Sequence, residues 1–414
     1  MDEPERARLL LILPTTTYRA DAFVDAARGL GWDLTVASEQ PSSFEDQHPA
    51  ELITVPLDDA DAAVEKVLAF ADRYPISAVV GVDDATTVLA AQLSHGLGLE
   101  ANPVAAVEAA GSKLAQRRLL HAAGVPVPEF RLVAADDDPE RVAGGVSYPC
   151  VLKPLSLSAS KGVIRANDAR EFAAARARLL AILGDADPAA REFLVEGYVP
   201  GEEYALEGLL VDGRLHVLAL FDKPDPLEGP FFEETIYLTP SRLSREDQGR
   251  LAECAGRATS ALGLIRGPVH VELRLNEDGP WFIELAARPI GGKCGRVLRF
   301  GAHSEYSLEY VILGHATGIL GDIPPRESLA AGVMMIPTPA AGILEEVGGV
   351  EDARAISGVE DVLITGHRGM ELVPLPEGGR YLGFIFARGD DPAGVEEALR
   401  RAHGRLEIRV KDGR

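Results

Sequence analysis

Cysteines are scarce in this sequence, and long apolar runs are absent. The 414 residues include three cysteines, Cys150, Cys254 and Cys294, and none of them forms a CxxC pair. A count this small and odd excludes a disulfide framework and is typical of a reducing, cytoplasmic location. No run approaches the roughly 18 apolar residues that a membrane helix needs. The short apolar run at 9–13 follows acidic residues, so it predicts a buried strand and not a signal peptide.

Positive charge is also in short supply, because 41 Lys and Arg residues face 64 Asp and Glu residues and leave a formal net charge of -23. A surface this acidic repels phosphate backbones and anionic membranes, so nucleic acid and membranes are not expected partners. Hydrophobic residues make up 46% of the chain, which excludes a wholly disordered protein. At roughly 150 residues per domain, the length predicts about three domains.

Lysine contributes only seven of the 41 basic residues. The lysines are Lys66, Lys113, Lys153, Lys161, Lys223, Lys293 and Lys411. Compositional bias accounts for most of this skew, but a chain that uses arginine elsewhere can keep lysine where a compact ammonium is needed. Five of the seven lie between positions 113 and 293, so this stretch is the candidate region for holding an anionic ligand.

The first hundred residues alternate between strand and helix patterns. Apolar strands are predicted at 9–13, 34–37 and 78–82, with helices at 23–30 and 62–74 between them. Buried strands alternating with helices indicate an open α/β sheet, which we expect to fill a domain at 1–103. No GxGxxG follows the first strand, so the dinucleotide-binding fingerprint is absent.

The remaining chain divides into a large middle part and a smaller end. Residues 104–147 have helical patterns, and strands dominate from about 149 onward, with a long helix at 245–262. We expect one domain at 104–322 and a C-terminal α+β module at 323–414, closed by a helix at 395–403.

The strongest chemical signal is a hairpin at 268–285 that carries two glutamates. A turn centred on Asp278 places Glu272 directly opposite Glu284, with their Cβ atoms about 4.5–5.5 Å apart. Two carboxylates this close repel each other unless one is protonated or a cation lies between them. Mg²⁺ prefers oxygen ligands of this kind together with substrate phosphates. The alternative is an exposed hairpin with solvated charges.

Two further segments have the character of a nucleotide site. Lys153 ends an apolar strand, and the loop at 155–163 offers small residues and hydroxyls to phosphate oxygens, although it is not a Walker loop. The strand-to-strand crossover at 194–204 exposes backbone groups that could hold an adenine edge, and Glu203 could accept from ribose hydroxyls. Taken singly, an ordinary surface loop and an acidic turn explain these two segments as well.

Four stretches in this order resemble the ATP-grasp superfamily of carboxylate–amine ligases. They are GSKLAQRRLLHAAGVPVPEF, YPCVLKPLSLSASKGV, LVEGYVPGEEYALEG and GPVHVELRLNEDGPWFIELAARPIGG. The stretch FDKPDPLEGPFFEET is similar to the amino-acid ligases of that superfamily. The resemblance covers residues 100–315. It implies an α+β ATP-grasp fold with a lid subdomain at about 148–205, between an N-terminal pre-ATP-grasp α/β domain and a small C-terminal β-rich module.

The resemblance implies a role for each matching residue. ATP would be held by Lys113, Lys153, Ser158, Ser160, Gly162, Glu196, Val199 and Glu203. Glu272 and Glu284 would bind Mg²⁺, with Mn²⁺ as an alternative. Arg288 would hold the acyl-phosphate, and with Lys153 it makes up the catalytic pair. Substrate contacts would come from His270, Glu233, Gly291 and Gly292.

One departure from the family pattern concerns the metal. Many members carry E-x-N-x-R, whereas this sequence has Ala286 in place of the asparagine, between Glu284 and Arg288. Either two glutamates and phosphate oxygens suffice, or His270, which the hairpin register places opposite Ala286, substitutes. We favour the first option because neutral imidazole is a poor Mg²⁺ ligand.

The resemblance implies an ADP-forming ligase that joins a small carboxylate, such as an amino acid, to an amine through an acyl-phosphate. The resemblance is compatible with a homodimer but does not require one. Two alternatives remain: an ATP-grasp carboxylase or nucleotide-pathway ligase, and a catalytically silent nucleotide-binding regulator. The sequence has no evident biotinyl-lysine module, which argues against a fused carboxylase.

Overall fold

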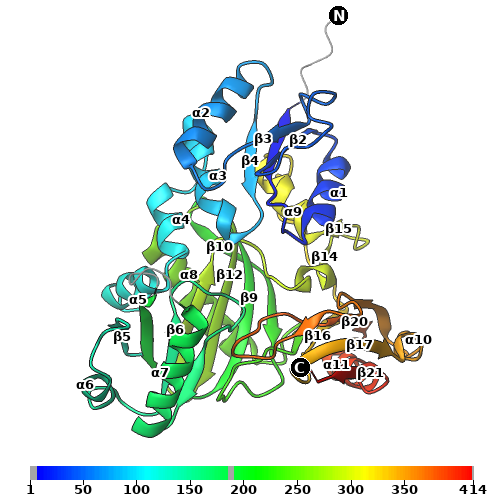
Figure 1. The fold of residues 1–414 in the computed structure, drawn as a ribbon. Coiled ribbons are helices and arrows are strands. Elements are labelled where there is room, and N and C mark those ends of the chain that lie inside the picture. The colour runs from blue at the N-terminus through cyan, green and yellow to red at the C-terminus, as the bar shows by residue number, and fades with distance from the viewer. Residues whose placement is uncertain (1–6, 185–190, 413–414) are drawn as a thin grey trace, which may run out of the picture.

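The computed structural model describes residues 7–184 and 191–412. Its N-terminal part, at the top of Figure 1, is a parallel four-stranded sheet in the order β3-β2-β1-β4. The elements are β1 (Arg8–Ile12), α1 (Ala20–Leu30), β2 (Asp33–Ser38), β3 (Leu52–Thr54), α2 (Ala60–Ala71), β4 (Ala78–Gly81) and α3 (Asp84–Gly96). The predicted open α/β sheet is therefore confirmed, with β3 and α3 as additions that the sequence did not reveal.

The continuous apolar run of β1 is explained by helices on both faces of the sheet. Leu9 and Leu11 pack with Phe23 of α1 on one face, whereas Leu10 and Ile12 pack with α2 and α3 on the other. All four leucine and isoleucine side chains are fully buried. A parallel strand covered on both faces needs apolar residues at every position, not at alternate ones.

Helix α9 (Leu308–Ala316) lies far along the chain but belongs in space to the N-terminal part. It packs beside α1 and β4. Its buried face joins the same core as Leu9 and Phe23. The predicted central domain at 104–322 included this helix, because local patterns do not show which sheet a helix covers.

The predicted lid is a small sheet of order β5-β8-β6-β7 with helices against it. Its elements are β5 (Phe130–Val133), α6 (Pro139–Ala143), β6 (Cys150–Pro154), β7 (Ile164–Ala166), α7 (Ala169–Leu183) and β8 (Phe193–Gly197). Strand β5 pairs with β8, so the subdomain begins before the predicted boundary at 148. Two helices, α4 (Val104–Ala110) and α5 (Lys113–Ala122), precede it.

The central sheet has eight strands and runs into the C-terminal module without a break. Its order is β13-β12-β9-β10-β11-β16-β20-β18. The strands are β9 (Glu202–Val211), β10 (Arg214–Asp222), β11 (Ile236–Thr239), β12 (Gly267–Asn276), β13 (Gly279–Ala286), β16 (Ala330–Ile336), β18 (Val359–Ile364) and β20 (Gly383–Gly389). The last three strands come from the module predicted at 323–414, so its sheet continues the central one.

The remaining elements lie outside the three sheets just described. They are α8 (Arg245–Leu262), the 3₁₀ helix η2 (Cys294–Val297), β14 (Arg299–Phe300), β15 (Tyr306–Ser307), β17 (Gly342–Gly348), α10 (Val350–Arg354), β19 (Glu371–Leu372), α11 (Pro392–His403) and β21 (Glu407–Lys411). The predicted helix at 245–262 coincides with α8. Its N-cap Ser244 accepts a hydrogen bond from the Asp247 N–H, and Gly263 ends it in the left-handed conformation.

Candidate active site

A cavity of about 660 Å³ lies where the N-terminal sheet, the lid and the central sheet meet. Thirteen of the fifteen residues predicted for the site line this cavity. They are Lys113, Lys153, Ser158, Ser160, Glu196, Val199, Glu203, His270, Glu272, Glu284, Arg288, Gly291 and Gly292. Segments separated by up to 179 positions in the sequence therefore converge on one volume.

The hairpin of β12 and β13 has the register that the sequence predicted at its cavity end. Glu272 is the pairing partner of Glu284, and His270 is that of Ala286. A bulge follows Glu272, so the register shifts by one residue toward the turn. Both glutamates line the cavity, which is a condition for the predicted pair of oxygen ligands to a hard cation.

Lys113 connects the lid loop to the carboxylate hairpin. As the first residue of α5, it follows the N-cap Ser112. Its ammonium donates to the Leu157 carbonyl at 2.9 Å and lies 3.4 Å from Glu284 Oε1. Glu284 is the more exposed partner, at 41%. The positive charge of Lys113 thus stands beside the proposed metal ligand and beneath the loop predicted to cover phosphates.

Lys153 shares a buried carboxylate with an arginine that was not among the predicted site residues. Its Nζ lies 3.0 Å from Glu196 Oε2, while Arg117 Nε lies 2.6 Å from Glu196 Oε1. Burial alone would raise the pKa of Glu196, but the charges of Arg117 and Lys153 lower it to about 2. Two cations around one carboxylate leave a net positive charge on this wall, which suits a phosphate.

Glu203 is held by two cations, one on β12 and one directly after β10. Lys223 Nζ donates to Oε1 at 2.8 Å, and Arg274 Nε donates to Oε2 at 2.9 Å. Arg274 also donates to the Val199 carbonyl at 2.7 Å. The predicted ribose carboxylate and the predicted adenine segment are therefore tied together through one guanidinium.

His270 contacts carboxylates through both ring nitrogens. Nδ1 lies 2.6 Å from Glu207 and Nε2 lies 3.4 Å from Glu272. Burial would lower the pKa of His270, but the hydrogen bonds with Glu207 and Glu272 raise it to about 9. A protonated imidazole has no lone pair for a metal. This geometry agrees with the option in which His270 does not replace the missing asparagine.

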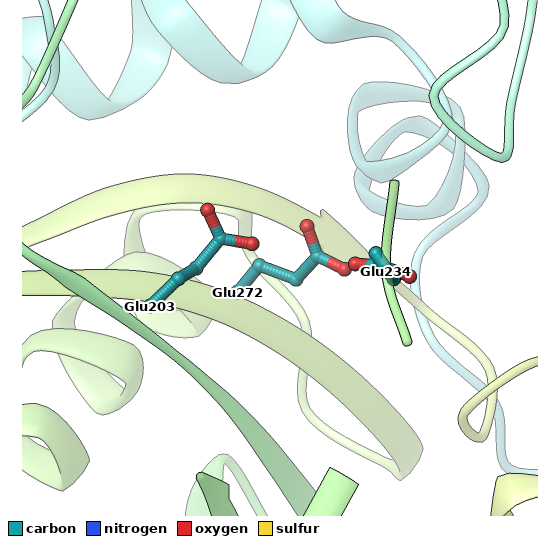
Figure 2. A group of neighbouring side chains, drawn as sticks. All are labelled: Glu203, Glu234 and Glu272. Atoms are coloured by element: carbon teal, nitrogen blue, oxygen red, sulfur yellow. The ribbon is translucent and has the colours of Figure 1, made fainter. Parts of the chain in front are cut away.

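Three glutamates from separate elements form a cluster on the cavity wall. The carboxylates of Glu203, Glu234 and Glu272 each place an oxygen within 4.8 Å of the others. Figure 2 shows Glu203 and Glu272 on adjacent strands, with the carboxylate of Glu234 next to that of Glu272. The Lys223 ammonium contacts all three.

The N-terminal part of the chain contributes residues that were not predicted to belong to the site. Asp84, the first residue of α3, lies 2.8 Å from Arg288 Nε, and Asp83 lies 3.2 Å from Arg19 Nε. Tyr18 accepts a hydrogen bond from the Gly292 N–H through its hydroxyl at 2.8 Å. A signal was available, because polar residues directly after a buried parallel strand mark the ligand-binding edge of such sheets.

Two predicted residues lie outside the cavity lining. Gly162 adopts φ +73°, donates its N–H to the Pro376 carbonyl and packs on Pro154. It therefore shapes the lid loop and ties it to the C-terminal module. Glu233 is half-buried beside the cavity, and its neighbour Glu234 faces the cavity instead.

Comparisons with known families agree with this geometry. A model of the ATP-grasp domain matches residues 146–297, one of the ATP-grasp N-terminal domain matches 24–100, and one of the L-amino acid ligase C-terminal domain 2 matches 334–411. The chain therefore contains an ATP-grasp domain together with an ATP-grasp N-terminal domain. The predicted fold class and the predicted class of ATP-dependent ligase are thereby confirmed.

Within the superfamily, the chain is similar to L-amino acid ligases along its whole length. The L-amino acid ligase structure from Bacillus licheniformis superimposes with a TM-score of 0.79 at 26% identity, covering 99% of this chain and 100% of that one. The uncharacterized protein y4rH of Sinorhizobium fredii is 27% identical over 95% of this chain and 81% of its own length. Alanine–anticapsin ligase of Bacillus subtilis is 28% identical over 56% of this chain, which spans 52% of that ligase.

None of the helices in the described ranges, 7–184 and 191–412, is long and apolar enough to cross a membrane.

Proposed function

We propose that the protein is an ADP-forming ligase that joins the carboxylate of an amino acid, or of a related small acid, to an amine. One observation carries this proposal: the opposed Glu272 and Glu284 share a cavity with Lys113, Lys153 and Arg288. Phosphoryl transfer to a carboxylate requires carboxylates that hold a metal ion and side-chain cations that hold phosphates. This cavity has two such carboxylates and three such side chains.

In the first proposed step, a substrate carboxylate oxygen attacks the γ-phosphorus of ATP. The bond from that phosphorus to the β–γ bridging oxygen breaks, which gives ADP and an acyl-phosphate. Lys153 and Lys113 balance the charge that develops on the phosphoryl oxygens. Ser158 and Ser160 stand on the loop above them, and Glu196, Val199 and Glu203 line the part of the cavity where the nucleoside would lie.

In the second proposed step, an amine nitrogen attacks the acyl carbon, and the proton it loses passes to the departing phosphate. The carbon–oxygen bond to phosphate breaks, so an amide and inorganic phosphate result. Arg288 faces the cavity at the end of β13, where its guanidinium can hold the acyl-phosphate and the tetrahedral adduct. The backbone N–H groups near Gly291 and Gly292 would lie beside the substrate carboxylate.

Glu272 and Glu284 would hold Mg²⁺, and Mn²⁺ is the alternative ion. The fit rests on two carboxylates paired across the hairpin; the Lys113 ammonium contacts Glu284 and the Lys223 ammonium contacts Glu272. When bound, the ion would neutralise charge on the β- and γ-phosphates. A homodimer and a cytoplasmic location stay predictions.

A screen of ATP turnover tests the proposed function. Purified protein is incubated with ATP, Mg²⁺ and pairs of amino acids or small amines, with phosphate release and product masses as the two readouts. We expect ADP and an amide mass that appear together and need both substrates. ADP formation with bicarbonate alone would favour a carboxylase, and turnover that never exceeds background with any pair would favour a nucleotide-binding regulator.

A further inference from the structure

Lys223 occupies the centre of the three-glutamate cluster. It directly follows β10, and its side chain is 3% exposed. Its Nζ lies 2.8 Å from Glu203 Oε1, 2.5 Å from Glu234 Oε1 and 3.3 Å from Glu272 Oε1. Among the described residues, the three glutamates line the cavity and Lys223 does not. The ammonium therefore supports the cavity wall from behind.

The three carboxylates need a cation to remain charged together. Their oxygens lie within 4.8 Å of one another, and like charges at that spacing repel strongly where water is excluded. A proton, a divalent ion or a side-chain cation can relieve the repulsion. The chain places an ammonium at the point that all three oxygens surround, which is where a divalent ion would otherwise bind.

Under the proposed function, each of the three carboxylates lies next to a different ligand. Glu203 would face the ribose, Glu272 the metal, and Glu234 the substrate side of the cavity, next to Tyr237. The Tyr237 ring lies 5.0 Å from Lys223 Nζ, which adds a cation–π contact. A shift of this ammonium would move all three subsites at once.

We propose that Lys223 is a positioning residue: a built-in cation that keeps divalent metal out of the Glu203–Glu234–Glu272 cluster and leaves the metal to Glu272 and Glu284. The metal pair in this proposal rests on the proposed function, but the exclusion of metal from the cluster does not. A fixed charge at this point also keeps Glu203 and Glu234 free of metal, so that they face nucleotide and substrate.

The first test counts bound Mn²⁺ by electron paramagnetic resonance in the absence of nucleotide, so it needs no turnover. We expect Lys223→Met to bind one more Mn²⁺ per chain than the wild type, at least tenfold more tightly than any wild-type site. Lys223→Arg keeps the cation and should titrate as the wild type does. The double variant K223M/E234Q restores the cluster's net charge and should lose the additional ion. Superimposable titrations of Lys223→Met and wild type would overturn the proposal.

A second measurement uses the wild type alone and so does not depend on whether a variant folds. Crystals soaked in Mn²⁺ should show anomalous density between Glu272 and Glu284 and none among Glu203, Glu234 and Glu272. Density inside the cluster would refute the role of Lys223. Density at neither place would leave the exclusion intact and count against the metal pair of the proposed function, so the two failures are distinguishable.

Turnover adds a readout that a purely structural role would not change. Lys223→Met should become inhibited at Mg²⁺ concentrations that saturate the wild type, because the additional ion ties up Glu203 and Glu234. The Lys223→Arg variant should show the wild-type Mg²⁺ dependence. An unchanged Mg²⁺ dependence in a folded, active Lys223→Met protein would contradict the proposal.

Discussion

Arg288 Nε and Asp84 Oδ1 lie 2.8 Å apart and join the end of β13 to the start of α3. The pair brings together residues 204 positions apart in sequence. Asp84 is about half exposed, whereas the Arg288 side chain is 18% exposed. The N-terminal sheet thus holds the guanidinium that would act on the acyl-phosphate, although it supplies none of the predicted ATP ligands.

Replacing Arg288 should stop the chemistry with little effect on ATP binding. Loss of one preorganised donor to developing charge costs roughly 10²–10³-fold in rate, so Arg288→Gln should lower kcat by about that factor. Asp84→Asn should have a smaller effect in the same direction, because it frees the guanidinium without removing it. ATP affinity by calorimetry and kcat by phosphate release separate the two effects.

Asp25→Asn is the matched control, since Asp25 pairs with Arg28 on the exposed surface. It should leave kcat unchanged. Equal losses in Asp25→Asn and Asp84→Asn would contradict the role of the Arg288 pair.

Neutralising Glu284 should impair metal-dependent turnover. Glu284→Gln removes one charged oxygen of the predicted metal pair, so kcat/KM should fall more than tenfold, which is about 1.4 kcal/mol, and the Mg²⁺ requirement should rise. Phosphate release across a Mg²⁺ series measures both. Glu277→Gln, in the exposed turn of the same hairpin, serves as control. The metal assignment is wrong if Glu284→Gln keeps its activity within tenfold.

The Glu196 carboxylate should make stability depend on pH in the acid range. Its pKa is lowered to about 2 in the folded protein from the ordinary 4.5. A lowered pKa means that its stabilising contribution is complete above about pH 4.5 and is lost as the pH falls toward 2. A shift of this size corresponds to up to about 3 kcal/mol.

Urea unfolding of wild type and Glu196→Gln between pH 3 and pH 6 checks the Glu196 prediction. The stability difference between the two proteins should be largest at pH 6 and should shrink as the pH falls. Glu253→Gln, at an exposed position of α8, should show no such trend. A difference that is constant with pH would mean that the Glu196 charge does not contribute.

Gly292 should limit how the substrate carboxylate approaches. It has φ +59°, and a Cβ there would lie 3.1 Å from Met335 Sδ and 3.4 Å from Cys294 Sγ. Gly292→Ala should therefore raise KM for the carboxylate about tenfold or more while KM for ATP stays within twofold. The backbone conformation alone costs roughly 1–2 kcal/mol for a residue with a side chain.

Gly31→Ala separates strain from obstruction, because Gly31 has φ +71° and nothing within 4 Å of its Cβ position. Both variants should lose stability in thermal unfolding, but only Gly292→Ala should change KM. A matching KM change in both would show that lost stability, and not obstruction, explains the effect.

Much of the site could be predicted because it lies on short local motifs. The alternation of β12 and β13 and the turn at Asp278 were enough to place Glu272 opposite Glu284, since hairpin pairing depends only on neighbouring residues. The bulge after Glu272 was not predicted. It lies toward the turn, so the pairing of residues at the cavity end of the hairpin is as predicted. Lys153 stood out because an ammonium inside an apolar strand needs an anion.

The ion-pair partners could not be predicted in the same way. Arg117 and Glu196 lie 79 positions apart, and Lys223 meets Glu203 and Glu272 across 20 and 49 positions. Single-sequence patterns give the face on which a side chain lies but not which distant face it meets. Lys223 was marked by its rarity alone, and its contacts became visible only in the folded chain.

The sequence by itself determined the ATP-grasp motifs, the open α/β start and the carboxylate hairpin, because these depend on local spacing and pattern. Tertiary structure decided three other things: that α9 covers the N-terminal sheet, that the central sheet continues through β16, β20 and β18, and that Asp84 reaches Arg288. The physical reason is that burial of apolar faces sets how sheets and helices pack, and this packing joins segments whose separation in sequence carries no signal.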